Sequence, residues 1–91
     1  MEKKVLELRI VGRVQGVYYR GSTKQKADEL GLTGWVKNEP NGEVSIAVEG
    51  VPELVDQFVT WCAQGPPMAS VQQVIPSPTI VKNYSKFTIL R

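Results

Sequence analysis

A turn near the middle of the chain constrains the fold more than any other feature of the sequence. Pro40-Asn41-Gly42 is a turn-forming run, and it separates two segments that have the composition of strands. The first segment is Leu32–Asn38, and the second, Glu43–Glu49, alternates between polar and apolar residues. Because Asn-Gly turns join strands that lie side by side, the two segments are predicted to form an antiparallel hairpin.

One strand and one helix are predicted before this hairpin. Val5–Val11 alternates, with leucine and isoleucine on one face and charged residues on the other, which is the period of a half-buried strand. Apolar residues then recur at helical spacing over Ser22–Leu30. Ser22 and Gln25 match a capping box at the start of this segment, and Gly31 suits a left-handed cap at its end. The first helix is therefore expected over Ser22–Leu30.

A second helix and two extended segments are predicted after the hairpin. Pro52 suits the first turn of a helix, and Gly65-Pro66-Pro67 ends it. The apolar stripe of this helix consists of Leu54, Val55, Phe58, Trp61 and Cys62. The chain becomes extended again at Val71–Ile75 and at Phe87–Leu90, and the stretch with proline and serine between them is interpreted as an irregular loop.

This order of elements predicts an α+β fold, a ferredoxin-like βαββαβ sandwich. A mostly antiparallel sheet of four to five strands should be covered on one face by two helices, and 91 residues suffice for a single domain over residues 1–91. Right-handed crossovers place the Glu43–Glu49 strand between Val5–Val11 and Leu32–Asn38. The segment from Gly12 to Arg20 and Asn38 should then be neighbours at one edge of the sheet.

Composition excludes several classes of site. The chain has no histidine and one cysteine, which rules out an intrachain disulfide, a histidine-based triad and a zinc site rich in histidine or thiolate. Asp and Glu residues show neither the spacing of a catalytic pair nor that of metal ligands, so no metal site is expected. The net charge of +2 disfavours a dedicated nucleic-acid binder, and no run is long enough to span a membrane. We expect a cytoplasmic protein in which Cys62 is a small buried apolar residue.

The loop that follows the first strand has the form of an anion-binding site. Two glycines punctuate the run from Gly12 to Tyr19, between a strand and a helix, where backbone N–H groups can converge on one point. Arg20 closes the loop, and its guanidinium could hold two oxygens of a phosphate. Alternatively, Arg20 is a solvated side chain, although a cation at a helix N-terminus is unfavourable unless an anion accompanies it.

Asn38 has two interpretations. It can be a turn residue that bonds to its own backbone, or it can orient a water molecule if it lies beside the glycine loop. The adjacent Lys37 should point to the opposite face and is treated as surface charge. Tyr18, Tyr19 and Trp35 favour packing in the core or loop over a stacking platform for RNA bases.

Two long runs of the sequence resemble a known family. Gly12-Arg13-Val14-Gln15-Gly16-Val17-Tyr18-Tyr19-Arg20 is similar to the first acylphosphatase signature. Gly34-Trp35-Val36-Lys37-Asn38-Glu39-Pro40-Asn41-Gly42-Glu43-Val44 resembles the second, at the spacing usual in that family. The resemblance extends over nearly the whole chain from about Leu8. One departure is Tyr19, because phenylalanine is more usual before the arginine.

The resemblance implies an acylphosphatase, which hydrolyses the carboxyl–phosphate bond of small acyl phosphates by direct in-line attack of water, without a metal or another cofactor. By this resemblance Arg20 and Asn38 are the catalytic residues, and Asn38 positions the attacking water. Phosphate-binding residues would be Gln15, Gly16, Val17, Tyr18, Tyr19 and Arg20. Inorganic phosphate is expected as product and competitive inhibitor, and the protein is expected to be a monomer that binds neither nucleic acid nor membrane.

Two other functions fit the same fold. One is a non-catalytic ferredoxin-like module that binds an anion or RNA, because a fold alone does not determine function. The other is a protein-interaction domain that retains an inherited phosphate site. Release of phosphate from an acyl phosphate distinguishes the enzyme from both.

Overall fold

A computed structural model of the chain describes residues 2–90. The elements in chain order are β1 (Lys4–Arg13), α1 (Tyr19–Glu29), β2 (Thr33–Asn38), β3 (Val44–Gly50), α2 (Pro52–Gln64), β4 (Ser70–Pro78) and β5 (Phe87–Ile89). The strands form one sheet in the order β4-β1-β3-β2-β5. β2 and β3 pair antiparallel, which confirms the predicted hairpin.

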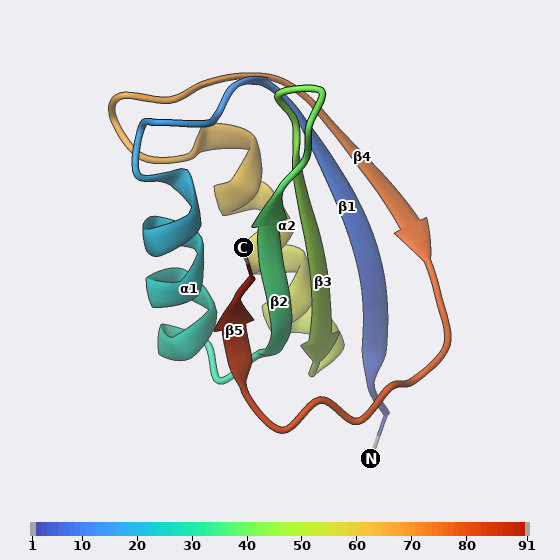
Figure 1. The fold of residues 1–91 in the computed structure, drawn as a ribbon. Coiled ribbons are helices and arrows are strands. Elements are labelled where there is room, and N and C mark those ends of the chain that lie inside the picture. Colours follow the sequence, from blue (N-terminus) through green and yellow to red (C-terminus); the bar gives the residue numbers. More distant parts are fainter. Residues whose placement is uncertain (1, 91) are drawn as a thin grey trace.

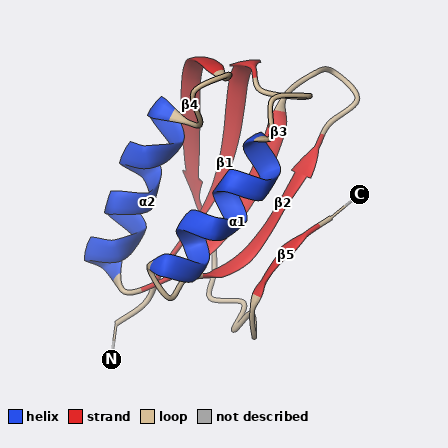
Figure 2. Cartoon of the chain, turned by 90° about the vertical axis from the view of Figure 1, so that its left-hand side faces the viewer, coloured by secondary structure: helices blue, strands red, loops and turns tan. Residues whose placement is uncertain are grey.

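The sheet is mixed, and both helices cover the same face of it. β3 lies between β1 and β2 and is antiparallel to both, as the right-handed crossovers require. β4 is antiparallel to β1, whereas β5 is parallel to β2. Figure 1 shows the curved sheet, and Figure 2 shows α1 and α2 side by side in front of it. The predicted ferredoxin-like α+β sandwich is therefore confirmed, with five strands.

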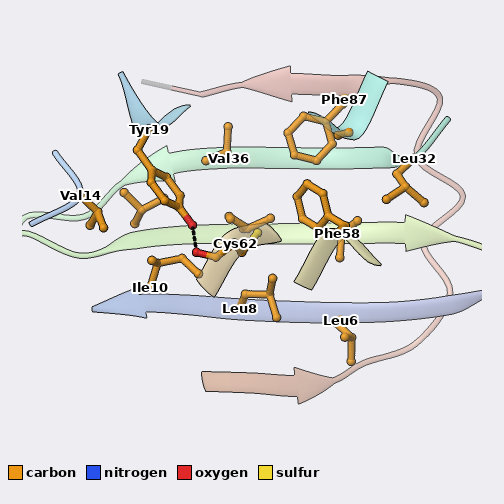
Figure 3. Packing of buried hydrophobic residues seen from close by; sticks show 14 of the residues in the cluster. Leu6, Leu8, Ile10, Val14, Tyr19, Leu32, Val36, Phe58, Cys62 and Phe87 are labelled. Carbon is orange, nitrogen blue, oxygen red and sulfur yellow. Dashed lines mark hydrogen bonds between the residues drawn. The ribbon is translucent and has the colours of Figure 1, made fainter. Parts of the chain in front are cut away.

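The core lies between the helices and the sheet (Figure 3). Leu6, Leu8 and Ile10 of β1 all point into it, which confirms the alternation seen in the sequence. From α2, the buried part of the predicted stripe is Val55, Phe58 and Cys62, and Leu54 and Trp61 lie at its margin. Full burial stabilises each large apolar side chain by about 1.5–3 kcal/mol, so this layer fixes the positions of α1 and β2.

Helix α1 begins earlier than predicted. It starts at Tyr19 rather than Ser22, and the N-cap residue is Tyr18, which makes no side-chain capping bond. The predicted capping box is wrong because the Ser22 N–H already donates to the Tyr18 carbonyl inside the first turn, at 3.1 Å. Burial of the Tyr19 ring, which is 1% exposed, outweighs the local capping preference of serine. Arg20 consequently lies in the first turn of the helix.

The end of α1 follows the prediction. Gly31 has a φ of 68°, in the left-handed region. Its N–H donates to the Asp28 carbonyl, and the Leu32 N–H donates to the Ala27 carbonyl, at 3.2 and 2.9 Å. This pair of bonds is a Schellman motif, in which a glycine ends the helix and directs the chain into the next strand. The sharp turn leads directly into β2.

β4 is longer than the sequence predicts. The prediction ended the strand at Ile75, but pairing with β1 continues, with Pro76 opposite Leu8 and Pro78 opposite Leu6. β4 is an edge strand, so the prolines can occupy alternate positions where a missing N–H faces solvent. Within residues 2–90, no helix is both long enough and apolar enough to cross a membrane.

Candidate active site

The loop of residues 14–18 joins β1 to α1 beside the β2–β3 hairpin (Figure 1). Two of its residues have left-handed backbone conformations, Gly16 with a φ of 74° and Tyr18 with a φ of 62°. Glycine adopts this conformation without strain, whereas a bulky residue rarely does. Strained backbone of this kind is concentrated at functional sites, so the conformation of Tyr18 singles out this loop.

Gln15 fastens the loop to the hairpin. Its Nε2 donates to the carbonyl oxygens of Glu39 and Glu43, both at 2.8 Å. Those two residues are themselves joined, since the Glu39 N–H donates to the Glu43 carbonyl at 2.8 Å. The side chain of Gln15 is therefore a structural clamp that sets the distance between the loop and the end of β2.

The N-terminus of α1 presents unpaired donors at this loop. The earliest backbone N–H that bonds within the helix is that of Ser22. The N–H groups of residues 19–21 precede it, so they have no intrahelical acceptor and point out of the end of the helix. A helix N-terminus also carries about half a positive charge, and Arg20 adds a full one. This end of α1 is suited to an anion.

Asn38 is the last residue of β2 and pairs with Val44 across the hairpin. Its Oδ1 is buried and makes no hydrogen bond with any group in residues 2–90. The turn interpretation does not hold for this residue, because Asn41 performs that role and accepts a bond from the Glu43 N–H at 3.0 Å. A buried amide oxygen without a partner is costly, and such groups are found where a substrate or water binds.

The loop, α1 and the end of β2 enclose a cavity of about 560 Å³. It is lined by Val14, Gly16, Tyr18, Tyr19, Arg20, Gly21, Asn38 and Ile89. Arg20 and Asn38, which are 18 positions apart in the sequence, therefore face one cavity, as the strand order predicted. Two predicted phosphate-binding residues do not line it: Gln15 is engaged with the hairpin, and Val17 is buried in the core.

The electrostatics of the cavity favour an anion. Arg20 is the one charged side chain among the lining residues that the structure describes. Its Nη1 donates to the Leu90 carbonyl at 3.4 Å. This bond uses one of the five N–H donors that a guanidinium carries. The ion pairs found within residues 2–90 lie outside the cavity, and the same residues contain no cluster of acidic, histidine or cysteine side chains that could hold a metal.

Tyr19 supports the cavity from the core. Its hydroxyl donates to the carbonyl of Cys62 in α2 at 2.8 Å (Figure 3). Its ring lies 5.9 Å from that of Trp61. Burial raises the pKa of the Tyr19 phenol well above its usual value, so this group remains protonated. Burial also raises the pKa of the Cys62 thiol to about 12, which fits the predicted role of a small buried residue.

The two aromatic residues before Arg20 differ in their surroundings. The prediction was packing in the core or in the loop: Tyr19 belongs to the core, whereas Tyr18 is 74% exposed and ends the loop as the N-cap of α1. Sequence reasoning also missed three lining residues, which are Val14, Gly21 and Ile89. A helix that begins at Tyr19 has Gly21 in its first turn, so a correct prediction of the helix start would have indicated Gly21 as a lining residue. Ile89 lies at the cavity because β5 pairs with β2, a long-range contact.

Comparisons with known proteins agree with this geometry. The acylphosphatase family model matches residues 6–89. The chain is 44% identical to the acylphosphatase of Methylococcus capsulatus over 97% of both chains, and 55% identical to that of Marinobacter nauticus over 74% of this chain and 73% of the relative. The solved acylphosphatase of Coxiella burnetii superimposes with a TM-score of 0.93 at 36% identity, over 97% of this chain and 93% of that one. The chain therefore belongs to the acylphosphatase family.

Proposed function

We propose that this acylphosphatase cleaves the carboxyl–phosphate bond of small acyl phosphates in the cavity between loop 14–18, α1 and the end of β2. One observation carries the proposal: the buried, unpartnered Oδ1 of Asn38 faces the same cavity as Arg20 and the N-terminus of α1. Such a site offers a cation for the phosphoryl group and an acceptor for a water molecule. Both are needed for hydrolysis, and an anion-binding module would need only the first.

In the binding step, Arg20 and the backbone N–H groups at the start of α1 hold the phosphoryl oxygens. A guanidinium presents donors in a planar fork that matches two such oxygens, and helix N–H groups add further bonds at a point of positive potential. Gly16 lets the loop bend toward the anion, with its φ of 74°. The charge that develops on the phosphoryl group in the transition state is stabilised by the same donors.

In the chemical step, Asn38 positions the attacking water. Its Oδ1 accepts a hydrogen bond from the water, which directs a lone pair of the water oxygen at phosphorus, opposite the carboxylate leaving group. The new P–O bond forms as the bond from phosphorus to the acyl oxygen breaks, and the electron pair of that bond leaves with the carboxylate. An amide cannot remove a proton at neutral pH, so its contribution is orientation.

The proton of the water passes to a phosphoryl oxygen of the substrate. Two observations support this route: the chain has no histidine, and no carboxylate is found among the lining residues that the structure describes. The hydroxyl of Tyr19, a lining residue, is held protonated and turned toward Cys62. A carboxylate leaves readily without protonation, so the reaction needs no general acid.

Further parts of the proposal concern the protein as a whole. Inorganic phosphate should compete with substrate, because Arg20 and the α1 N-terminus bind the product with the same donors. We also propose that residues 1–91 form one domain and that the protein acts as a monomer. A location in the reducing cytoplasm is compatible with the free, buried thiol of Cys62.

The role of Asn38 is tested by phosphate release from benzoyl phosphate, with a chelator present. Asn38→Ala should lower kcat by about 10²- to 10³-fold, the usual cost of one well-placed catalytic contact, and leave the inhibition constant of phosphate within about twofold. Asn41→Ala, three residues along in the exposed turn, is the matched control. A folded Asn38→Ala protein with wild-type kcat would refute this role.

The role of Arg20 is tested by inhibition with inorganic phosphate. Arg20→Ala should lower kcat/KM and weaken the inhibition by at least about tenfold, because the guanidinium contacts the anion in both ground and transition states. Arg13→Ala serves as control, since Arg13 is an exposed arginine at the end of β1 that does not line the cavity. Equal losses in the two variants would mean that net charge, rather than the position of Arg20, attracts the substrate.

A further inference from the structure

The cavity has more room and more apolar surface than phosphoryl transfer requires. Its volume of about 560 Å³ lies within the range of pockets that enclose whole small molecules. A water molecule takes about 30 Å³ of liquid volume, so a phosphoryl group and one water leave much of this space unfilled. Arg20 and Asn38 supply the side chains that the mechanism above uses, whereas the side chains of the lining residues Tyr18 and Ile89 have no part in it.

The ring of Tyr18 lies along the first turn of α1. Its backbone is left-handed, with a φ of 62°, and this turns the side chain back toward residue 21. That residue is glycine, and a Cβ built on Gly21 would overlap the ring of Tyr18 at Cζ. The missing side chain at Gly21 therefore makes the space that the ring occupies. Although 74% exposed, the ring therefore lies against the first turn of α1, beside the cationic end of the helix.

Ile89 lines the cavity from β5, whereas Tyr18 lines it from the start of α1. It lies two positions after the buried Phe87 in β5, and so shares with it the helix side of the sheet. The bond from Arg20 Nη1 to the Leu90 carbonyl brings the end of β5 against the first turn of α1. Ile89 is 38% exposed. Tyr18 and Ile89 are thus two exposed apolar side chains, from separate elements, that line one cavity with Arg20.

Exposed apolar side chains that converge on a polar site commonly contact the apolar part of a ligand. We propose that Tyr18 and Ile89 form an acyl-binding wall, which selects acyl phosphates with aromatic or bulky apolar acyl groups over acetyl phosphate. This inference rests on the proposed site, because Arg20 must fix the phosphoryl group for the acyl group to reach the wall. Stacking on the phenol ring and contact with the isoleucine stabilise the bound aromatic acyl group, and a methyl group is too small to use both contacts.

The test is the ratio of kcat/KM for benzoyl phosphate to kcat/KM for acetyl phosphate. Damage to phosphate binding lowers both values together, so the ratio reports only on recognition of the acyl group. Ile89→Ala should lower it by about 3- to 10-fold, as expected for loss of one aromatic–apolar contact. Thr88→Ala is the matched control, since Thr88 lies next to Ile89 in the same strand but points to the other face of the sheet.

Two variants of α1 test the other half of the wall. Tyr18→Asn removes the ring and retains a residue that tolerates the left-handed backbone, and Gly21→Ala displaces the ring without deleting any of its atoms. Alanine is also the better helix former, so Gly21→Ala should remain folded. Both should lower the ratio by a similar factor.

Each outcome distinguishes the wall from the site. If the wild-type protein hydrolyses both substrates and the ratio is unchanged in Ile89→Ala, Tyr18→Asn and Gly21→Ala, the wall is refuted and the site stands. If wild type releases phosphate from neither substrate, the proposed site fails and the wall with it. Lower ratios in all three variants, with Thr88→Ala at the wild-type value, support the wall.

Discussion

Tyr19→Phe removes a single oxygen from the core and should destabilise the protein measurably. The Tyr19 hydroxyl donates to the carbonyl of Cys62 at 2.8 Å, and its residue is 1% exposed. In a continuing helix that carbonyl would accept from the N–H of residue 66, but residue 66 is proline and has no N–H. The phenol therefore supplies the hydrogen-bond donor that Pro66, which follows α2, lacks.

The expected magnitude follows from this arrangement. Loss of the bond costs about 1 kcal/mol, and the carbonyl left without a partner in the core adds a penalty of about 1 kcal/mol or more. The free energy of unfolding should fall by about 2 kcal/mol, which corresponds to about 8–16 °C in Tm for a domain of this size. Equilibrium unfolding in urea measures it, with an unchanged slope against denaturant.

Tyr18→Phe is the matched control for this experiment. Tyr18 precedes Tyr19 in the chain but is 74% exposed, so removal of its hydroxyl should change the free energy of unfolding by less than about 0.5 kcal/mol. If Tyr19→Phe is as stable as Tyr18→Phe, the Cys62 carbonyl has found another donor, and the argument from Pro66 is refuted.

Three other groups give further tests. Burial raises the pKa of Glu49, but hydrogen bonds from the backbone N–H groups of residues 82–84 outweigh burial and hold that pKa below its usual range. The ionised carboxylate therefore stabilises the folded protein at pH values above the pKa of the unfolded state, and this stabilisation is lost as the pH falls through the pKa of the folded state. Glu49→Gln should therefore cost about 2 kcal/mol at pH 7 and flatten the acid limb of urea unfolding measured against pH. Cys62, whose pKa is raised to about 12, should react with a thiol reagent at pH 8 on the order of 10³-fold more slowly in the native than in the denatured protein, and rates within tenfold would contradict its burial. Gln15→Ala should lower kcat by up to about 10²-fold through misplacement of the loop, although it removes no group that contacts substrate.

Periodicity was sufficient to predict most of the fold. The alternation in β1 and the turn at Pro40-Asn41-Gly42 are local signals, and local signals survive in the folded chain when burial agrees with them. The start of α1 was mispredicted because the capping preference of Ser22 competes with burial of Tyr19, which depends on α2. The extension of β4 through Pro76 was missed because edge position, which makes proline acceptable, is a property of the whole sheet.

The same distinction, between local signals and long-range contacts, separates the site residues that the sequence predicted from those that it did not. Arg20 and Asn38 were predicted together because the order of strands alone places the ends of β1 and β2 on one edge. The clamp of Gln15 on the hairpin and the entry of Ile89 depend on side-chain contacts across 24 to 28 residues and on the parallel pairing of a three-residue strand. Neither contact has a signal in sequence spacing, so both are apparent only in the folded structure.

The central claim is that phosphate binds at the loop of residues 14–18 and the first turn of α1, and titration of the ¹⁵N-labelled protein with inorganic phosphate tests it most directly. The amide signals of Gly16, Tyr19, Arg20 and Asn38 should move with one dissociation constant, equal to the inhibition constant from the kinetic assay. Signals around Glu49, at the opposite end of β3, should remain unchanged. Largest shifts at any other surface, or a dissociation constant that differs from the inhibition constant by more than about tenfold, would contradict the claim.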